Sequence, residues 1–450
     1  MESAIYEADT TRLLLASIVG IVLLLLLIIK FKIHPILSLL VSALFIGLGA
    51  GMPITLLTET VESGAGKTLE GIVLLIGLGS MFGGILEVSG GAKSVAQTLV
   101  NKFGEKKAGI ALGITGLIVG TTVFFEAGVM ILIPLAFGLA QKTGKSTLIY
   151  VIPLLAGLAT GFAFIPPSAG SVLMANMLGV DLGIMIVVGV PTGILSLLFA
   201  GIFWSKYIGN RVFAALPTNI EADAEEANLP SFYSVMMIIL IPLILILLST
   251  ISSYVTFLDV VKPVVLFLGT PFVALIVAIF VAMYVLGVKQ GYTAEMLKQV
   301  LDKALKPTAG ILLVITGGGI ISEVLQVCGV GEIVGSSLEK SGLPLILVAF
   351  LIAAIIRICV GAAVVSMTMT AGIMMTMPAV AGLSPLYLAA MVCAINGGAT
   401  AFSHVNDSGF WMVSSLLEIN EKDTLKSWTI METIVGFTGL GCALLISLIA

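Results

Sequence analysis

Ionisable side chains that lie deep inside uncharged stretches are the residues of this sequence that could do chemistry. Glu126 has 18 uncharged residues before it and 15 after it, and Arg357 is the one formal charge in residues 341–403. His404 and Asp407 follow directly after that stretch. Because a charge at the centre of a bilayer costs about 2.5 kcal/mol or more, each group implies a partner or a water-filled cavity. Ionisable groups inside membrane segments are typical of transport pathways and proton relays. We expect Arg357 to bind the carboxylate of a transported substrate, and Glu126 or Asp407 to bind the proton that crosses the membrane with it.

Each of these residues also has a purely structural interpretation. Arg357 could instead form an ion pair with Glu126 or Asp407, or reach the membrane surface if its span is shifted. Glu126 could be a buried carboxylate that fixes helix packing, and His404 could be a neutral, hydrogen-bonded histidine. The sequence leaves these alternatives open.

Two short segments interrupt apolar stretches with helix-breaking or polar residues. They are residues 164–170, which include Pro166 and Pro167, and residues 402–409. Proline and glycine stop helices, and non-helical backbone at membrane depth is buried in protein or lines a cavity. We expect a substrate to bind between the two breaks, although both could be surface loops between ordinary spans. The side chains expected to bind it are Arg357, Ser168, Ser171, Ser403, His404, Asn406, Asn396 and Thr122.

The composition places these residues in a membrane protein. Of 450 residues, 59% are hydrophobic and 10% are charged, whereas soluble domains carry about 25% charged residues. Residues 13–29 hold no charge, as is typical of a membrane-spanning helix. The net charge of −4 offers no basic surface for nucleic acid, and four Cys and two His without ligand spacing predict no metal site. A soluble enzyme and a nucleic-acid-binding protein are excluded, and we expect no catalytic residue and no resident cofactor.

The chain carries a weak internal repeat. Residues 76–90 align with residues 315–329 without a gap, and the same alignment superimposes the two breaks. The repeat predicts three parts: a first transmembrane repeat at 1–216, a cytoplasmic linker at 217–232 and a second transmembrane repeat at 233–450.

The loops that match between the two repeats differ in basic charge. Residues 89–108 hold four Lys against one in 329–344, whereas 51–70 hold one against four in 288–307. Because Lys and Arg favour the cytoplasmic side, the repeats should have inverted topology, which is typical of secondary transporters. We expect a third span at about 70–88, and both chain termini on the outer side.

The segment around the second break is similar to a known family. Phe402-Ser-His-Val-Asn-Asp-Ser-Gly-Phe-Trp411, followed by Thr424–Trp428 and Met431–Ile434, closely resembles the C-terminal signature of the gluconate permease family. Phe125-Glu-Ala-Gly128 is also similar, and the resemblance runs from about Leu13 to the C-terminus. It implies a bacterial inner-membrane proton symporter for gluconate, related sugar acids or D-serine. It also implies re-entrant hairpins and an elevator-like or rocking motion.

The first break departs from the family pattern. Gluconate permeases usually have Pro-Pro-His-Pro-Gly-Pro there, whereas this chain reads Pro166-Pro-Ser-Ala-Gly-Ser171. The missing histidine does not change the expectation of a transporter. It does widen the expected substrates from gluconate to a shorter hydroxy acid or another sugar acid.

Together these features predict an all-α polytopic membrane protein with two inverted-topology repeats and broken helices or re-entrant hairpins. We expect a secondary active transporter of the bacterial inner membrane that imports a small hydroxy-acid or sugar-acid carboxylate with protons. The alternatives are sodium-coupled or passive transport of another small carboxylate or D-amino acid. The expected partners are this substrate and the lipid bilayer, with a homodimer left open.

Overall fold

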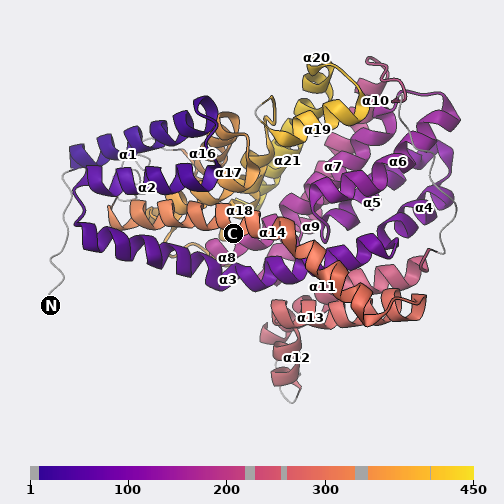
Figure 1. The fold of residues 1–450 in the computed structure, drawn as a ribbon, viewed down its shortest axis with the longest axis horizontal. Coiled ribbons are helices and arrows are strands. Elements are labelled where there is room, and N and C mark those ends of the chain that lie inside the picture. The colour runs from indigo at the N-terminus through magenta and orange to yellow at the C-terminus, as the bar shows by residue number, and fades with distance from the viewer. Residues whose placement is uncertain (1–9, 218–228, 255–260, 330–342, 406) are drawn as a thin grey trace.

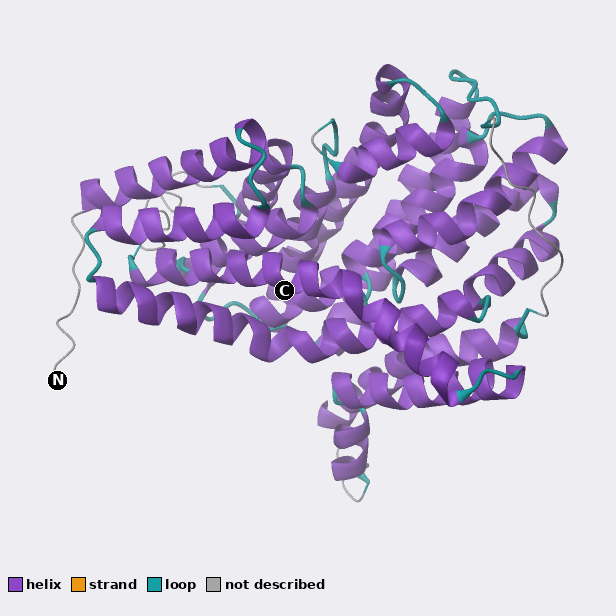
Figure 2. Ribbon diagram, in the orientation of Figure 1, coloured by secondary structure: helices purple, strands orange, loops and turns teal. Residues whose placement is uncertain are grey.

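The computed structural model describes residues 10–217, 229–254, 261–329, 343–405 and 407–450. Every regular element in this part of the chain is a helix (Figure 2). By length and composition, eight of the described helices can cross a membrane, or up to nine if the bent helix α3 counts as one span. The predicted all-α polytopic membrane fold is confirmed.

The helices follow one another with few long connections. The first part of the chain forms α1 (Thr10–Leu25), α2 (Pro35–Ala50), α3 (Ile54–Val88), α4 (Gly91–Phe103), α5 (Ala108–Gly120), α6 (Phe125–Thr143), α7 (Leu148–Phe164), α8 (Ala169–Met177), α9 (Leu182–Ser196) and α10 (Trp204–Gly209). The second part forms α11 (Phe232–Tyr254), α12 (Lys262–Leu268), α13 (Pro271–Ala282), α14 (Ala294–Val327), α16 (Leu345–Val360), α17 (Ala363–Met375), α18 (Pro385–Thr400), α19 (Ser408–Leu417), α20 (Glu421–Thr424) and α21 (Ile430–Ser447).

The helices form an elongated body. In Figure 1, α1, α2 and the first half of α3 lie at one end, and α4, α6 and α10 lie at the other. The helices α7, α18 and α21 pack against one another, and this group carries the ends of the broken helices.

Two long helices, α3 and α14, pack along each other. They contain most of residues 51–70 and 288–307, so the prediction of loops there is wrong. The third span expected at about 70–88 corresponds to the second half of α3 and stays a prediction. Helix α3 is bent by 42° between Ile54–Glu70 and Val73–Val88. The charged residues form the outer turns of long helices, because Glu and Lys are good helix formers and no proline interrupts residues 54–88.

Contacts between the polar parts hold these two helices together. Lys67 of α3 lies 2.6 Å from a carboxylate oxygen of Glu323 in α14. The Thr308 hydroxyl of α14 donates to the Ser80 hydroxyl of α3 at 2.7 Å. Thr293 caps α14 by accepting a hydrogen bond from the Met296 backbone N–H. An ion pair and a hydroxyl contact therefore join the two helices at two points along their length.

Similar helices recur in the same order in the two parts of the chain. The series α3, α5, α6, α7 and α8 is matched by α14, α16, α17, α18 and α19, with the breaks in the same places. The inverted orientation of the two repeats and their exact boundaries stay predictions.

Glycine lets some of these helices touch at the backbone. A Cβ atom at Gly157 of α7 would collide with the carbonyl oxygen of Gly113 in α5. A Cβ atom at Gly397 of α18 would lie 2.7 Å from the carbonyl oxygen of Gly436 in α21. Small residues at such crossings are the usual means of close helix packing in membranes. These contacts hold α7 and α18, which lead to the two predicted breaks, against their neighbours.

Candidate functional site

A cavity of about 640 Å³ lies where the broken helices meet. The breaks predicted between α7 and α8 and between α18 and α19 are confirmed. Two further breaks, at 121–124 between α5 and α6 and at 361–362 between α16 and α17, complete the wall. Four helices present their N-terminal ends to the cavity, through Phe125 of α6, Ala169 of α8, Ala363 of α17 and Ser408 of α19.

These four helix ends make the cavity suitable for an anion. A helix N-terminus carries unpaired backbone N–H groups and about half a positive elementary charge. Ser168 caps α8 and Asp407 caps α19, whereas α6 and α17 begin without a side-chain cap. Carboxylates and phosphates bind at such ends. The ends of α6 and α17 therefore offer backbone donors to a ligand.

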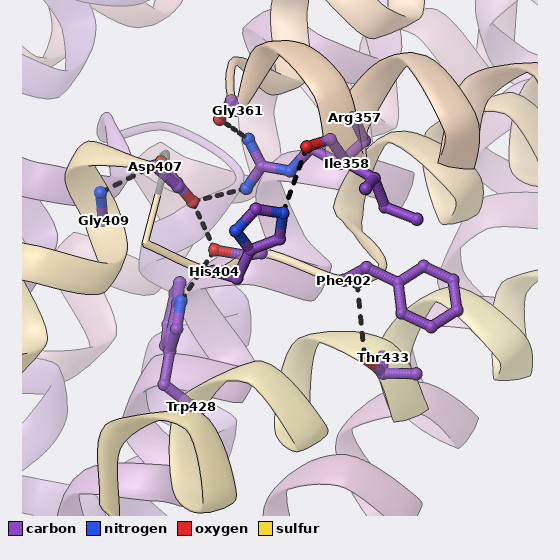
Figure 3. A network of polar contacts seen from close by, with 10 residues as sticks. Arg357, Ile358, Gly361, Phe402, His404, Asp407, Gly409, Trp428 and Thr433 are labelled. Carbon is purple, nitrogen blue, oxygen red and sulfur yellow. Dashed lines mark hydrogen bonds and ion pairs between the residues drawn. The ribbon is translucent and has the colours of Figure 1, made fainter. Parts of the chain in front are cut away.

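Arg357, near the C-terminal end of α16, supplies a full positive charge to the same wall. It is 4% exposed and lines the cavity. Its Nη2 donates to the Asp407 carboxylate at 2.5 Å, and its Nη1 donates to the Gly361 carbonyl oxygen (Figure 3). The Nε atom is buried without a hydrogen-bond partner among the described residues. The structure thus contains the ion pair with Asp407, and at least the Nε donor of the guanidinium has no hydrogen-bond partner among the described residues.

The segment between α18 and α19 holds Asp407 in place. Its carboxylate accepts hydrogen bonds from the Ser403 hydroxyl and, at 3.0 Å, from the Gly409 backbone N–H. The Ser403 hydroxyl in turn accepts from the indole N–H of Trp428 at 2.8 Å. Figure 3 shows these groups converging on the Asp407 carboxylate from the broken segment and from the segment that precedes α21. Ser403 therefore positions Asp407 and does not itself line the cavity.

His404 lies beside this network. Its Nε2 donates to the backbone carbonyl of Ile358 at 3.1 Å. The ring therefore ties the second break to the end of α16, which is the hydrogen-bonded arrangement weighed for it as a structural alternative. The remaining candidate of this segment, Asn406, lies outside the described residues.

Glu126 also lines the cavity, from the first turn of α6. Its side chain is exposed, so it does not fill a contact between helices. Lys32 and His34, from the connection between α1 and α2, lie on the same cavity wall. Neither residue is among those predicted from the sequence, because the connection that holds them is far along the chain from both predicted breaks.

Two of the predicted residues lie on a second, much smaller cavity of about 20 Å³. Thr122 and Ser168 line it together with Ser80 and Thr121. A cavity of this size holds about one water molecule. The four hydroxyl groups come from α3 and from the breaks after α5 and α7.

Ser171 and Asn396 line neither cavity. The hydroxyl groups of Ser171 and Ser168 lie 2.7 Å apart, which stabilises the first turn of α8. The side-chain amide of Asn396 donates to the Ala163 carbonyl at 2.6 Å and joins α18 to the end of α7. Both residues therefore support the breaks from within the protein.

Glu432, like Lys32 and His34, lines the cavity although it is not among the site residues predicted from the sequence. It lies in the first turn of α21, lines the large cavity and is 4% exposed. A signal was present, because Glu432 is the only charge in the last 24 residues, 427–450. Because Glu432 is far along the chain from both breaks, the sequence alone does not predict that it lines the same cavity as Arg357 and Asp407.

The all-helical membrane body, the paired helix breaks and the polar cavity where they meet define a polytopic membrane transporter. A family model described as GntP family permease matches residues 12–449. The chain belongs to this permease family, as its resemblance to gluconate permeases implied, and it is a transporter and not an enzyme.

Individual relatives agree with this assignment. A low-affinity gluconate transporter of Escherichia coli (strain K12) is 36% identical over 432 residues, which cover 96% of this chain and 97% of that protein. A gluconate permease of Pseudomonas aeruginosa is 35% identical over 443 residues, which cover 97% of this chain and 98% of that protein. The crystal structure of the Alcanivorax borkumensis YdaH transporter is 17% identical and shares the fold, with a TM-score of 0.60 over 85% of this chain and 86% of that chain.

Proposed function

We propose that this protein is a secondary active symporter that imports a gluconate-like sugar acid, or a related hydroxy acid, together with protons. The observation that carries the proposal is the cavity in which four helix N-termini and the Arg357 guanidinium face a common space. The family and the gluconate transporters of similar sequence support this substrate class.

The substrate carboxylate is proposed to bind to Arg357 and to the uncapped N-termini of α6 and α17. The Arg357 Nε atom and the backbone N–H groups of these helix ends are the donors that a carboxylate requires. The cavity volume of about 640 Å³ lies within the range of about 300–1,000 Å³ that is typical of small-molecule sites. Its Glu126 and Asp407 carboxylates can accept hydrogen bonds from the hydroxyl groups of a polyol chain.

The charge of the cavity supports the proposal of proton coupling. Arg357 is already paired with Asp407, so a second carboxylate adds an uncompensated negative charge in a region of low dielectric constant. A proton that enters with the substrate removes this charge. From the sequence, Glu126 and Asp407 are the two candidates to bind it, and both line the cavity.

Sodium coupling is a second candidate, and the small cavity favours it. Four hydroxyl groups line a space large enough for one water molecule or ion, next to the C-terminal ends of α5 and α7. Helix C-termini carry partial negative charge, and oxygen atoms are the ligands that hard cations take. A sodium ion bound there would lie next to the substrate site, because Phe124, Phe162 and Ala169 line both cavities.

The membrane arrangement is proposed with the function. The protein would lie in the bacterial inner membrane with both termini outside, the linker at 217–232 inside and two inverted repeats at 1–216 and 233–450. The two sets of broken helices would move against the rest of the protein to expose the cavity on alternate sides. A homodimer is compatible with this arrangement.

Binding to the purified protein tests the substrate class. Gluconate, shorter hydroxy acids, D-serine and an uncharged polyol of gluconate length should be compared by equilibrium binding. We expect gluconate or another sugar acid to bind, and the uncharged polyol to bind at least about tenfold more weakly, because it lacks the carboxylate that Arg357 and the helix ends recognise. Equal affinity for the uncharged polyol would contradict the proposed carboxylate site.

A further inference from the structure

Glu432 is a carboxyl group in the substrate cavity that no cation neutralises through a hydrogen bond in the described structure. It is 4% exposed, and its Oε1 atom is buried without a hydrogen-bond partner among the described residues. It lines the same cavity as Arg357 and Asp407. A buried polar atom without a partner is rare, and an isolated buried charge is costly, so this position requires an explanation.

The surroundings of Glu432 contain few charges. Helices α7, α9, α16 and α18 and the segments Leu197–Phe203 and Leu425–Thr429 pack against α21, and their charged residues are Arg357 and Lys426. Lys426 is exposed and forms an ion pair with Asp423. The other titratable or charged groups on the cavity wall are Lys32, His34, Glu126 and Asp407. The Arg357 guanidinium is directed to Asp407 and to the Gly361 carbonyl. The negative charge of Asp407 therefore offsets the positive charge of Arg357 and weakens its attraction for the Glu432 carboxylate.

The three carboxyl groups of the cavity differ in how well their ionised forms are stabilised. The Asp407 anion accepts hydrogen bonds from Arg357, Ser403 and Gly409, and a proton on Asp407 would disrupt this arrangement. Glu126 is exposed and lines the cavity, so protein does not enclose it as it encloses Glu432. The Oε1 atom of Glu432 has neither kind of stabilisation among the described residues, and a proton there disrupts no contact.

We propose that Glu432 is the group that binds the coupling proton and so makes occupation of the cavity by a sugar acid dependent on protonation. This inference rests on the proposed function, and it assigns the proton to a residue other than Glu126 or Asp407. A proton from water forms an O–H bond with the Glu432 carboxylate on the outer side. The neutral carboxyl group then donates that hydrogen to an oxygen atom of the bound substrate. On the inner side the substrate leaves and the proton returns to water, so charge and atoms balance.

The dependence of substrate binding on pH distinguishes this role from a structural one. Gluconate affinity of the wild-type protein should fall about tenfold for each pH unit above the titration of the coupling group, because one proton binds with each anion. Glu432→Gln mimics the protonated form in shape and charge. Its gluconate affinity should be nearly independent of pH between about pH 5 and 8, and its proton uptake per bound gluconate should fall from about one to nearly zero.

Two further variants complete the experiment. Glu421→Gln makes the same chemical change at an exposed residue of the short helix α20, outside the cavity, and should keep the wild-type pH dependence. Glu432→Asp retains a titratable group and should keep a slope of about tenfold per pH unit with a displaced midpoint. The Asp variant also provides the measurement if the Gln variant does not fold.

The outcomes separate this inference from the proposed function. A Glu432→Gln variant with the wild-type pH dependence and proton uptake would overturn the role of Glu432. So would folded Gln and Asp variants that both bind gluconate without any pH dependence. A wild-type protein that binds no sugar acid would contradict the proposed function.

The role of Glu432 can still be tested in that case, without a ligand. Proton uptake of the unliganded wild type on acidification should exceed that of Glu432→Gln by one proton. Equal uptake would overturn the proposal that Glu432 binds a proton.

Discussion

The Arg357–Asp407 ion pair offers a quantitative test of the site, through the variants Asp407→Asn and Arg357→Gln and their combination. Asp407→Asn leaves the Arg357 guanidinium, which is 4% exposed, without its carboxylate. Removing one partner of a buried ion pair costs about 3–5 kcal/mol, so this variant should unfold several degrees below the wild type. Arg357→Gln should cost less, because the Ser403 hydroxyl and the Gly409 N–H still stabilise the Asp407 anion.

The double variant shows whether the two charges act as a pair. It contains neither an uncompensated cation nor an uncompensated anion, so its loss of stability should be smaller than the sum of the single losses by about 0.5–3 kcal/mol. Thermal unfolding of the purified proteins in one detergent, with and without gluconate, measures these differences. Strictly additive losses would refute the conclusion that Asp407 neutralises Arg357.

The same variants report on the substrate. In Asp407→Asn, a bound carboxylate restores the lost negative charge beside Arg357, so gluconate should raise the unfolding temperature of this variant more than that of the wild type. In Arg357→Gln, gluconate should produce no shift. A gluconate-induced shift that survives Arg357→Gln would remove Arg357 from the proposed carboxylate site.

Four further predictions address other parts of the protein. Glu126→Gln should retain uptake driven by a proton gradient if Glu432 binds the proton, and loss of that uptake with intact gluconate binding would return the role to Glu126. Gly157→Ala should lower stability by about 1–3 kcal/mol in thermal unfolding, because the methyl group meets backbone of α5, and an unchanged unfolding temperature would contradict that contact. Trp428→Phe should abolish a gluconate-induced change in tryptophan fluorescence, because Trp428 lines the cavity, and persistence of the change would assign it to another tryptophan. Hydrogen bonding and the positive charge of Lys142 lower the pKa of Glu105, so the stability from this exposed pair is present above the ordinary Glu pKa and lost as the pH falls through the lowered value. Glu105→Gln should leave the unfolding temperature unchanged near pH 7, because exposed ion pairs contribute little. A fall of several degrees would contradict a weak surface pair.

Much of the fold could be predicted from the sequence because a membrane restricts the possible structures. Long apolar stretches must form helices there, and clusters of proline, glycine and polar residues must interrupt them. The breaks at 164–170 and 402–409 were therefore found from residue types alone. The charges in 51–70 and 288–307 predict loops, but the same residues suit the ends of helices that extend beyond the apolar stretch, and most of both segments is helical.

The parts of the site that were missed depend on packing between distant segments. The breaks at 121–124 and 361–362 contain no proline, so their sequences differ little from those of continuous membrane helices. Glu432 is the only charge in residues 427–450, but the cavity that gives it a chemical role forms only when α21 packs against α16 and α18. Spacing along the chain cannot reveal such a meeting of helices.

Uptake of radiolabelled gluconate by proteoliposomes with an imposed pH gradient tests the central claim most directly. With the outside acidic and no sodium present, the account predicts accumulation of gluconate above its external concentration, and a protonophore should abolish this accumulation. Accumulation that requires a sodium gradient and ignores the pH gradient would contradict proton coupling. Mere equilibration of gluconate, with or without either gradient, would contradict active transport.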